Sequence, residues 1–457
     1  MNRTTILSVV IALASLGGAF AMRPQPVPQV VYEDTGELFF PSFTDPSQAA
    51  SLEVVGWDET GARVTTFKVE LKDGKWTIPS HNDYPADGTE RMGKAAASFI
   101  DVRKDMYRGD RAEDHAKFGL DDPADPNAKE RGQRITIKDA SGTTLADVVV
   151  GKKVEDKEGY RYVRLADQKR VYAAKIEVDI STNFTDWIEK DLLRLEQDQI
   201  VQFMSDTYKV DEAQGKVLGS DPFLVKKDAA DAEGDAWLVA DGVTAPEGKE
   251  LDSFKVKQAL SGLDRLQIVG VRPRPPAFSD QMLIQQMQAK GFFFSIKPGG
   301  GEARLYGNEG EVKAICDDGV VYSLYFGEVT YDSGLALTAG AEQPAAAKPE
   351  GEEAKDSKKE ANRYMLVDVF YDPTLDTKSA PAEGAKPEDA PGAKRAQELA
   401  ARFGKWFYVI SDASFKQIRK DKAEFFREAT AKPATPATPA APAKAPAKKD
   451  AAKKPAK

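Results

Sequence analysis

The alternation of hydrophobic and polar positions predicts a series of short strands from residue 51 onward. Residues 51–55 form a first apolar-rich strand, and residues 64–71 alternate apolar with polar side chains. The dipeptide Asp73-Gly74, which is typical of a tight hairpin turn, then leads into a further strand at residues 75–78. This part of the chain therefore starts with an antiparallel arrangement of strands.

A helix, four strands and a second helix are predicted to follow. Residues 89–105 place apolar side chains on one face at helical spacing, namely Met92, Ala95, Ala96, Phe99 and Ile100. The next apolar segments predict strands at 135–137, 145–150, 160–165 and 171–174. A helix is expected to close the series at residues 185–195.

The same order of elements recurs in the second half of the chain. Strands are predicted at 199–203, 223–226, 236–239, 292–296, 312–316, 320–326, 363–367 and 406–410, with helices at 249–266 and 280–290. In each half a tryptophan, Trp76 or Trp237, follows a turn and precedes an amphipathic helix. We expect each indole to be wedged between sheet and helix, with stacking on a ligand as the alternative. The recurrence predicts an α+β fold of two tandem related domains, 50–197 and 198–428, each a mainly antiparallel sheet with covering helices.

The N-terminal segment, residues 1–22, holds an uninterrupted apolar run from Thr5 to Ala21, preceded by Arg3. As a helix this run is about 26 Å long, slightly shorter than the roughly 30 Å hydrocarbon core of a membrane. The small residues of Ala19-Phe20-Ala21 also fit the cleavage site of a signal peptide. Both alternatives, an N-terminal membrane helix and a cleaved signal, stay open. Either one places the body outside the cytoplasm, anchored to the inner membrane or exported to the periplasm, with residues 23–49 as linker and lead-in.

Three segments are predicted to be disordered. Residues 340–362 and 376–398 are inserts of the second domain that are rich in Ala, Pro, Glu and Lys, and residues 429–457 form an Ala/Pro/Lys tail. The tail carries a formal charge of +6 and the remainder −15, out of a total of −9. Such an acidic body argues against nucleic acid as a partner. The basic tail is free to contact anionic envelope surfaces or to stay solvated.

Candidate reactive side chains are few. The two histidines, His81 and His115, lie in polar, loop-like surroundings, and no nucleophile elbow accompanies them. The single cysteine, Cys316, falls in a predicted strand and is expected to be a small buried apolar residue. We therefore predict no catalytic, cofactor-binding or metal-ligating residues and no cofactor.

Three further motifs are expected to be structural. Gly299-Gly300-Gly301 lacks the Lys-Ser/Thr of a phosphate loop, so a flexible turn is predicted. The acidic segment from Asp121 to Pro126 lacks the glycine and distal glutamate of a calcium loop, which favours a turn. The segment from Arg272 to Pro276 is predicted to be a stiff basic connector between two helices.

The order of landmarks in the first half resembles a known bacterial family. The landmarks are Trp76, Lys117-Phe118-Gly119-Leu120-Asp121-Asp122-Pro123, Val150-Gly151-Lys152, Tyr162-Val163-Arg164 and the segment from Asp186 to Leu193. This order is similar to that of domain-of-unknown-function family 4340. In the second half, Ala289-Lys290-Gly291-Phe292 stands where Phe118-Gly119-Leu120 is expected, without the Asp-Asp-Pro. The resemblance implies an envelope protein with an N-terminal hydrophobic segment, often encoded beside ABC-type transporter components, and it supplies no catalytic residues.

Together these observations predict a non-catalytic extracytoplasmic envelope protein. We expect an interaction module or accessory of an ABC-transporter-like complex, in contact with the membrane through the N-terminal helix if that helix is not cleaved. The alternative is an extracytoplasmic ligand-binding protein with a groove between the two repeats. A hydrolase is the weakest alternative, because no nucleophile motif supports it.

Overall fold

The computed structural model describes residues 34–59, 62–211, 216–231, 236–274, 281–295, 304–340, 360–378 and 386–429. Within these ranges no helix has both the length and the apolar character needed to cross a membrane. The predicted leader at residues 1–22, the glycine run at 299–301, most of the insert 340–362 and nearly all of the tail 429–457 lie outside the described residues.

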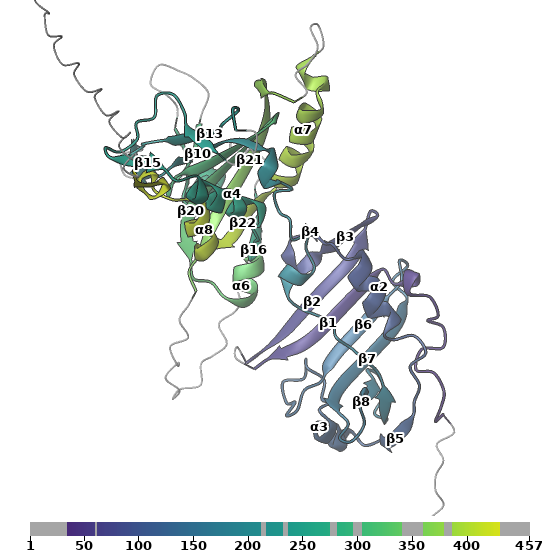
Figure 1. Ribbon diagram of the computed structural model, residues 1–457. Coiled ribbons are helices and arrows are strands. Elements are labelled where there is room, and N and C mark those ends of the chain that lie inside the picture. Colours follow the sequence, from purple (N-terminus) through teal and green to yellow (C-terminus); the bar gives the residue numbers. More distant parts are fainter. Residues whose placement is uncertain are drawn as a thin grey trace, which may run out of the picture.

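The first unit is built on a nine-stranded antiparallel sheet (Figure 1). Its strands are β1 (Ser51–Asp58), β2 (Arg63–Lys72), β3 (Lys75–Ile78), β4 (Tyr84–Pro85), β5 (Met106–Gly109), β6 (Gln133–Lys138), β7 (Thr144–Lys153), β8 (Tyr160–Leu165) and β9 (Val171–Lys175). Two short helices accompany them, α2 (Thr89–Ala97) and α3 (His115–Phe118).

The second unit is built on an eight-stranded antiparallel sheet. Its strands are β10 (Ile200–Asp206), β13 (Phe223–Lys227), β14 (Trp237–Val239), β16 (Gly270–Pro273), β19 (Glu311–Cys316), β20 (Asp318–Thr330), β21 (Asn362–Asp376) and β22 (Trp406–Ser411). Five helices belong to this unit: α4 (Ser253–Asp264), α5 (Gln281–Gln288), α6 (Gly334–Ala339), α7 (Pro391–Phe403) and α8 (Asp412–Ile418). Three two-stranded pairs complete it: β11 (Lys209–Asp211) with β12 (Lys216–Leu218), β15 (Lys249–Leu251) with β23 (Phe426–Glu428), and β17 (Phe292–Ser295) with β18 (Arg304–Gly307).

The two sheets order their strands in the same way. The first sheet runs β4-β3-β2-β1-β6-β7-β8-β9-β5, and the second runs β14-β13-β10-β19-β20-β21-β22-β16. When β14 is placed on β3 and β16 on β5, all eight positions follow one order along the chain. The predicted α+β class with mainly antiparallel sheet is therefore present, whereas the edge strands β4, β5 and β16 were not predicted.

Each sheet buries one face under helices. In the first unit Leu52, Val54 and Ile135 pack with Ala96 of α2, and all four are fully buried. In the second unit α4 and α8 lie over the sheet (Figure 1). Val256 and Leu260 of α4 are buried in its hydrophobic core. The cores of the two units form one continuous cluster of buried side chains, so the units are packed together.

The opposite face of the first sheet holds a second, small core. Phe118 and Leu120 pack there on Val149 and Val171. A Cβ on Gly151 would lie 2.8 Å from the carbonyl oxygen of Gly119, so only glycine lets the α3 turn approach β7. Several motif residues that suggested the family are thus packing residues.

The second unit repeats this arrangement with different residues. Phe292 is fully buried and packs on Leu366 and Phe407, and it follows Gly291 in a left-handed conformation. A Cβ on Gly327 would clash with the backbone of Lys290. The Ala289–Phe292 segment thus lies on β20 as the Phe118–Leu120 segment lies on β7.

An arginine on the next strand reinforces each of these contacts. Arg161 of β8 donates to the Gly151 carbonyl at 3.0 Å, and Arg363 of β21 donates to the Gly327 carbonyl at 2.9 Å. Each arginine therefore satisfies a glycine carbonyl on the neighbouring strand.

Several predicted helices are shorter than expected. The helix predicted over 89–105 ends at Ala97, because Asp101 turns the chain with a φ of 61° toward the unpredicted edge strand β5. The helix predicted over 249–266 is α4, which begins after the capping side chain of Asp252 and follows strand β15. The helix predicted over 280–290 is α5.

Two segments adopt another structure than the one predicted for them, namely 185–195 and 272–276. The helix expected at 185–195 is a single 3-10 turn, Phe184–Asp186, followed by an irregular segment with several bends. Apolar side chains from 187 to 195 are buried on more than one side, which a one-sided helix does not allow. The connector from Arg272 to Pro276 is a sheet strand in its first two residues, because they pair with β22.

The insert 376–398, predicted to be disordered, contains the start of α7 at Pro391. Ala, Lys, Arg, Gln, Glu and Leu have high helix propensity, and Ala396, Leu399 and Phe403 recur at helical spacing and are buried. The compositional argument failed here because strong helix formers with an apolar stripe bury surface despite a low aromatic content.

The close contact at Gly151 predicts a large cost for adding one methyl group. We expect Gly151→Ala to lower the free energy of unfolding by about 2 kcal/mol, because the new Cβ meets backbone oxygens that cannot move away. Thermal unfolding followed by circular dichroism measures the loss. The control is Gly93→Ala in α2, where nothing lies within 4 Å of the new Cβ, and it should leave stability unchanged or slightly higher. Equal stability of the two variants would contradict the close-packing argument.

Candidate functional site

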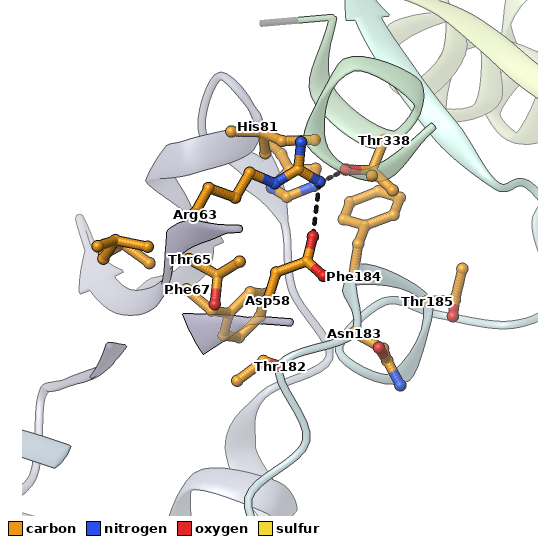
Figure 2. A pocket seen from close by; sticks show the side chains of 14 residues that line it. Asp58, Arg63, Thr65, Phe67, His81, Thr182, Asn183, Phe184, Thr185 and Thr338 are labelled. Atoms are coloured by element: carbon orange, nitrogen blue, oxygen red, sulfur yellow. Dashed lines mark hydrogen bonds and ion pairs between the residues drawn. The ribbon is translucent and has the colours of Figure 1, made fainter. Parts of the chain in front are cut away.

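Helix α6 makes one of the contacts between the two units. This helix occupies the connection between β20 and β21 of the second unit. Its Thr338 hydroxyl forms a 2.9 Å hydrogen bond with Nε2 of His81, in the first unit (Figure 2). His81 is 3% exposed, and its ring stacks on Phe184 with centroids 4.3 Å apart. A buried imidazole therefore joins the two units.

Arg272 holds α6 in place from the side of the second sheet. The guanidinium is buried and donates to the carbonyl oxygens of Ala336 and Leu337, which belong to the last turn of α6. A cation at a helix C-terminus satisfies free carbonyls and opposes the negative end of the helix dipole. Gly340 then ends the helix with a φ of 71°. The edge strand β16 thereby fixes the helix that touches the first unit.

Helix α7 makes a second contact between the units through two arginines on one side of the helix. Arg402 pairs with Glu189 at 2.7 Å, and Arg395 pairs at 2.7 Å with Asp318 of β20, in its own unit. Arg395 also donates to the carbonyl oxygen of Arg194 at 3.2 Å. Glu189 and Arg194 both belong to the segment that leaves the first unit.

Aromatic and hydroxyl groups support this second contact. Tyr84 packs edge-on against Trp406 with centroids 4.9 Å apart, and both side chains are buried. The Tyr322 hydroxyl donates to the Leu193 carbonyl at 3.1 Å. Burial alone would raise the pKa of Glu189, but hydrogen bonds from Arg194 and Arg402 lower it below the ordinary value. The carboxylate is therefore held in its charged form for both arginines.

A cavity of about 390 Å³ opens beside the α6 contact, and we call it the junction groove. Its lining residues are Asp58, Arg63, Val64, Thr65, Thr66, Phe67, His81, Thr182, Asn183, Phe184, Thr185, Gly334, Leu335 and Thr338. Figure 2 shows Thr338 of α6 facing His81 and Phe184 of the first unit, with Asn183 and Thr185 at the rim. Both units contribute residues to the groove.

The charged groups of the junction groove are compensated. Asp58 and Arg63 form an ion pair of 3.1 Å between the ends of β1 and β2. Burial lowers the pKa of His81 to about 4, with a smaller contribution from the positive charge of Arg272. The imidazole is therefore neutral near pH 7. A groove lined by hydroxyls, an amide and a neutralised ion pair is suited to an uncharged polar ligand.

The other reactive side chains of the described chain have structural partners. His115, expected in a loop, is buried in α3 and bonds to the Lys169 carbonyl at 2.8 Å. Cys316 is fully buried in β19 as predicted, and burial raises its pKa to about 12. Within the described ranges no group of three or more His, Cys, Asp or Glu side chains is arranged to hold a metal ion.

The acidic segment from Asp121 to Pro126 is a set of turns, as predicted. The carboxylate of Asp121 accepts hydrogen bonds from the backbone N–H groups of Lys129 and Glu130. The Asp122 and Asp125 side chains each accept from the backbone N–H two residues ahead. These oxygens therefore stabilise the local backbone.

The two tryptophans differ in burial. Trp237 is 5% exposed and belongs to the core of the second unit, and its backbone N–H donates to the hydroxyl of Ser253 at the start of α4. Trp76 is half-buried against the core and lies close to Gly88, which precedes α2. The predicted position between sheet and helix is therefore confirmed for both.

Sequence reasoning did not identify the residues of the junction groove. The expectation of a groove between the two halves named no residue. Of the lining residues, only His81 is among the candidate reactive side chains, and the sequence predicts polar, loop-like surroundings for it. The signal that could have found more was the pair of inserts, since the connections that follow β20 and β21 each carry a helix that contacts the first unit.

Comparison with known proteins gives one family. Residues 76–283 match the family model described as "Domain of unknown function (DUF4340)". The match begins at Trp76 in β3 and continues into α5, so it includes parts of both units. No curated protein and no solved structure gives a significant match. The resemblance to this family is confirmed.

The low pKa of His81 predicts acid sensitivity. Because the folded state binds this proton less readily than the unfolded state, stability should fall as the pH drops from about 6.5 to about 4, and by roughly 3 kcal/mol for this group. Denaturant unfolding of wild type and His81→Gln at several pH values measures the effect. The stability difference between the two proteins should shrink toward pH 4. Parallel curves across this range would contradict the assignment.

The arginines of α7 predict a loosening of the two units without loss of either fold. We expect the double variant Arg395→Ala, Arg402→Ala to increase the maximum dimension of the chain in small-angle X-ray scattering, because the ion pair to Glu189 and the hydrogen bond to the Arg194 carbonyl are lost. The control is Arg265→Ala, at the C-terminal end of α4, whose guanidinium donates to Ser261 of the same helix. Identical scattering of double variant and control would show that α7 does not hold the units together.

Proposed function

We propose that this chain, whose residues 76–283 belong to the DUF4340 family, is a non-catalytic extracytoplasmic envelope protein that acts as an interaction module. The proposal includes the role of an accessory in an ABC-transporter-like complex and a leader at residues 1–22 that anchors or exports the body. The observation that supports it is the direct attachment of the two units through α6 and α7. Two sheets held in a fixed relation present a defined surface to a partner.

We also infer that the two units arose by duplication. The eight shared strand positions support this inference. So do the matched contacts Arg161 to Gly151 and Arg363 to Gly327, which lie at equivalent strands of the two sheets. The helices α6 and α7 have no counterpart in the first unit, where residues 154–159 and 166–170 form the corresponding short connections. On this inference, both inserts of the second copy serve to attach it to the first.

A second candidate is supported by the junction groove. A cavity of about 390 Å³ lined by threonine side chains is of the size of a small-ligand site. Its position between the units agrees with the alternative of a ligand-binding protein with a groove between the repeats. The interaction module is preferred because the groove is open along one side to a strand edge, as described below.

Affinity purification from membranes tests the proposal. We expect the tagged full-length chain, extracted from membranes with detergent, to be recovered together with subunits of an ABC-transporter-like complex. A chain whose residues 1–22 are replaced by an unrelated cleavable signal peptide is the matched control for the leader, and it should appear in the periplasmic fraction. Recovery of the full-length chain alone, in a soluble fraction, would contradict the proposal.

A further inference from the structure

Strand β2 has an open edge in the junction groove. On one side its residues from Arg63 to Glu70 pair with β1. On the other side only Glu70, Leu71 and Lys72 pair with β3. Among the described residues no strand covers the stretch from 63 to 69 on that side. Unpaired edges of this kind are sites where another chain can add as a strand.

The register shows which backbone groups face the open edge. The hairpin turn Asp73-Gly74 makes Lys72 and Lys75 the closing pair, so the Lys72 backbone groups point toward β3. Along a strand, the N–H and C=O groups of successive residues point to alternate sides. Those of Val64 and Thr66 therefore point to the same side as those of Lys72, toward the open edge. The Leu71 N–H donates to the Ala50 carbonyl on the opposite side, as this alternation requires.

The junction groove follows this edge. Val64 and Thr66 place their side chains on one face of the sheet, and Thr65 and Phe67 place theirs on the other. All four residues line the same cavity. A single cavity contacts both faces only where it runs around the edge of the strand. Across the groove, Leu335 and Thr338 of α6 form the facing wall.

We propose that the junction groove binds an extended polypeptide segment of a partner protein, which adds as a short strand to the β2 edge. The inference rests on the proposed interaction function and names the chemistry of the partner. Backbone groups of Val64 and Thr66 recur at the two-residue spacing of an extended chain, about 7 Å, which only another extended backbone matches group for group. This repeat favours a peptide over a saccharide, although both are uncharged polar ligands.

The lining selects among peptides. Asp58 and Arg63 neutralise each other, and His81 is neutral near pH 7. The remaining lining offers threonine hydroxyls and the apolar surfaces of Val64, which is 42% exposed, and Leu335. Small hydroxylated or β-branched side chains therefore fit, and such residues also favour extended conformation.

Peptide binding tests the proposal directly. The probe is a fluorescein-labelled peptide Lys-Thr-Val-Thr-Val-Thr-Lys, titrated with the full chain and followed by fluorescence anisotropy. Thr66→Pro removes the outward N–H at an edge position where proline is tolerated, and it should weaken binding at least about tenfold. The control Thr66→Val keeps the backbone and should bind within about twofold of wild type. Equal binding by Thr66→Pro, or binding of maltotriose without binding of the peptide, would overturn the proposal.

Two further measurements use the wild-type chain, so that the test does not depend on whether Thr66→Pro folds. A peptide with an N-methylated central threonine should bind wild type at least about tenfold more weakly, because it lacks one backbone donor. In hydrogen exchange of the free chain, the amides of Val64 and Thr66 should exchange faster than those of Thr65 and Phe67, and the peptide should slow them. Equal protection of all four amides would refute the open edge. Because this pattern needs no membrane partner, its failure is distinct from a failed membrane purification.

Discussion

The backbone N–H and C=O groups at the edge of a sheet lack strand partners, and the contact between the two units forms at two such edges. Helix α6 lies against the edge strand β16, where the Arg272 guanidinium holds its last turn, and it faces the partly open edge of β2 in the other unit. One short helix thus contacts two sheets at once. The hydrogen bond from Thr338 to His81 and the junction groove both follow from this placement.

The strands and their order could be predicted because their signals are local. Alternation of apolar residues and the Asp73-Gly74 turn gave the hairpin, and the matched segments of the two halves gave the strand sequence. The segment from 185 to 195 could not be predicted in the same way. Its apolar side chains are buried against two units, and a pattern read along one chain does not separate two partners from one helix face.

The site was less accessible to sequence reasoning than the fold. Asp58, Arg63, Thr182 and Thr338 are common polar residues, and only the packing of α6 brings them together. At α7 the composition was misleading, since a run rich in Ala, Lys and Glu predicted disorder where a helix forms. The glycines 151 and 327 show the opposite case, where a small residue marks a close backbone approach that the sequence could not reveal.

The contacts of α7 have a consequence for the conditions under which the protein is studied. Arg402 and Glu189 are 24% and 38% exposed, so dissolved ions reach their pair. At physiological ionic strength the screening length is about 8 Å, and it falls to about 3 Å in molar salt. The α6 contact, made by a buried imidazole and a hydroxyl, does not share this sensitivity. High salt should therefore weaken the ion pair of α7, while the buried packing of Tyr84 on Trp406 and the α6 contact keep the two units together.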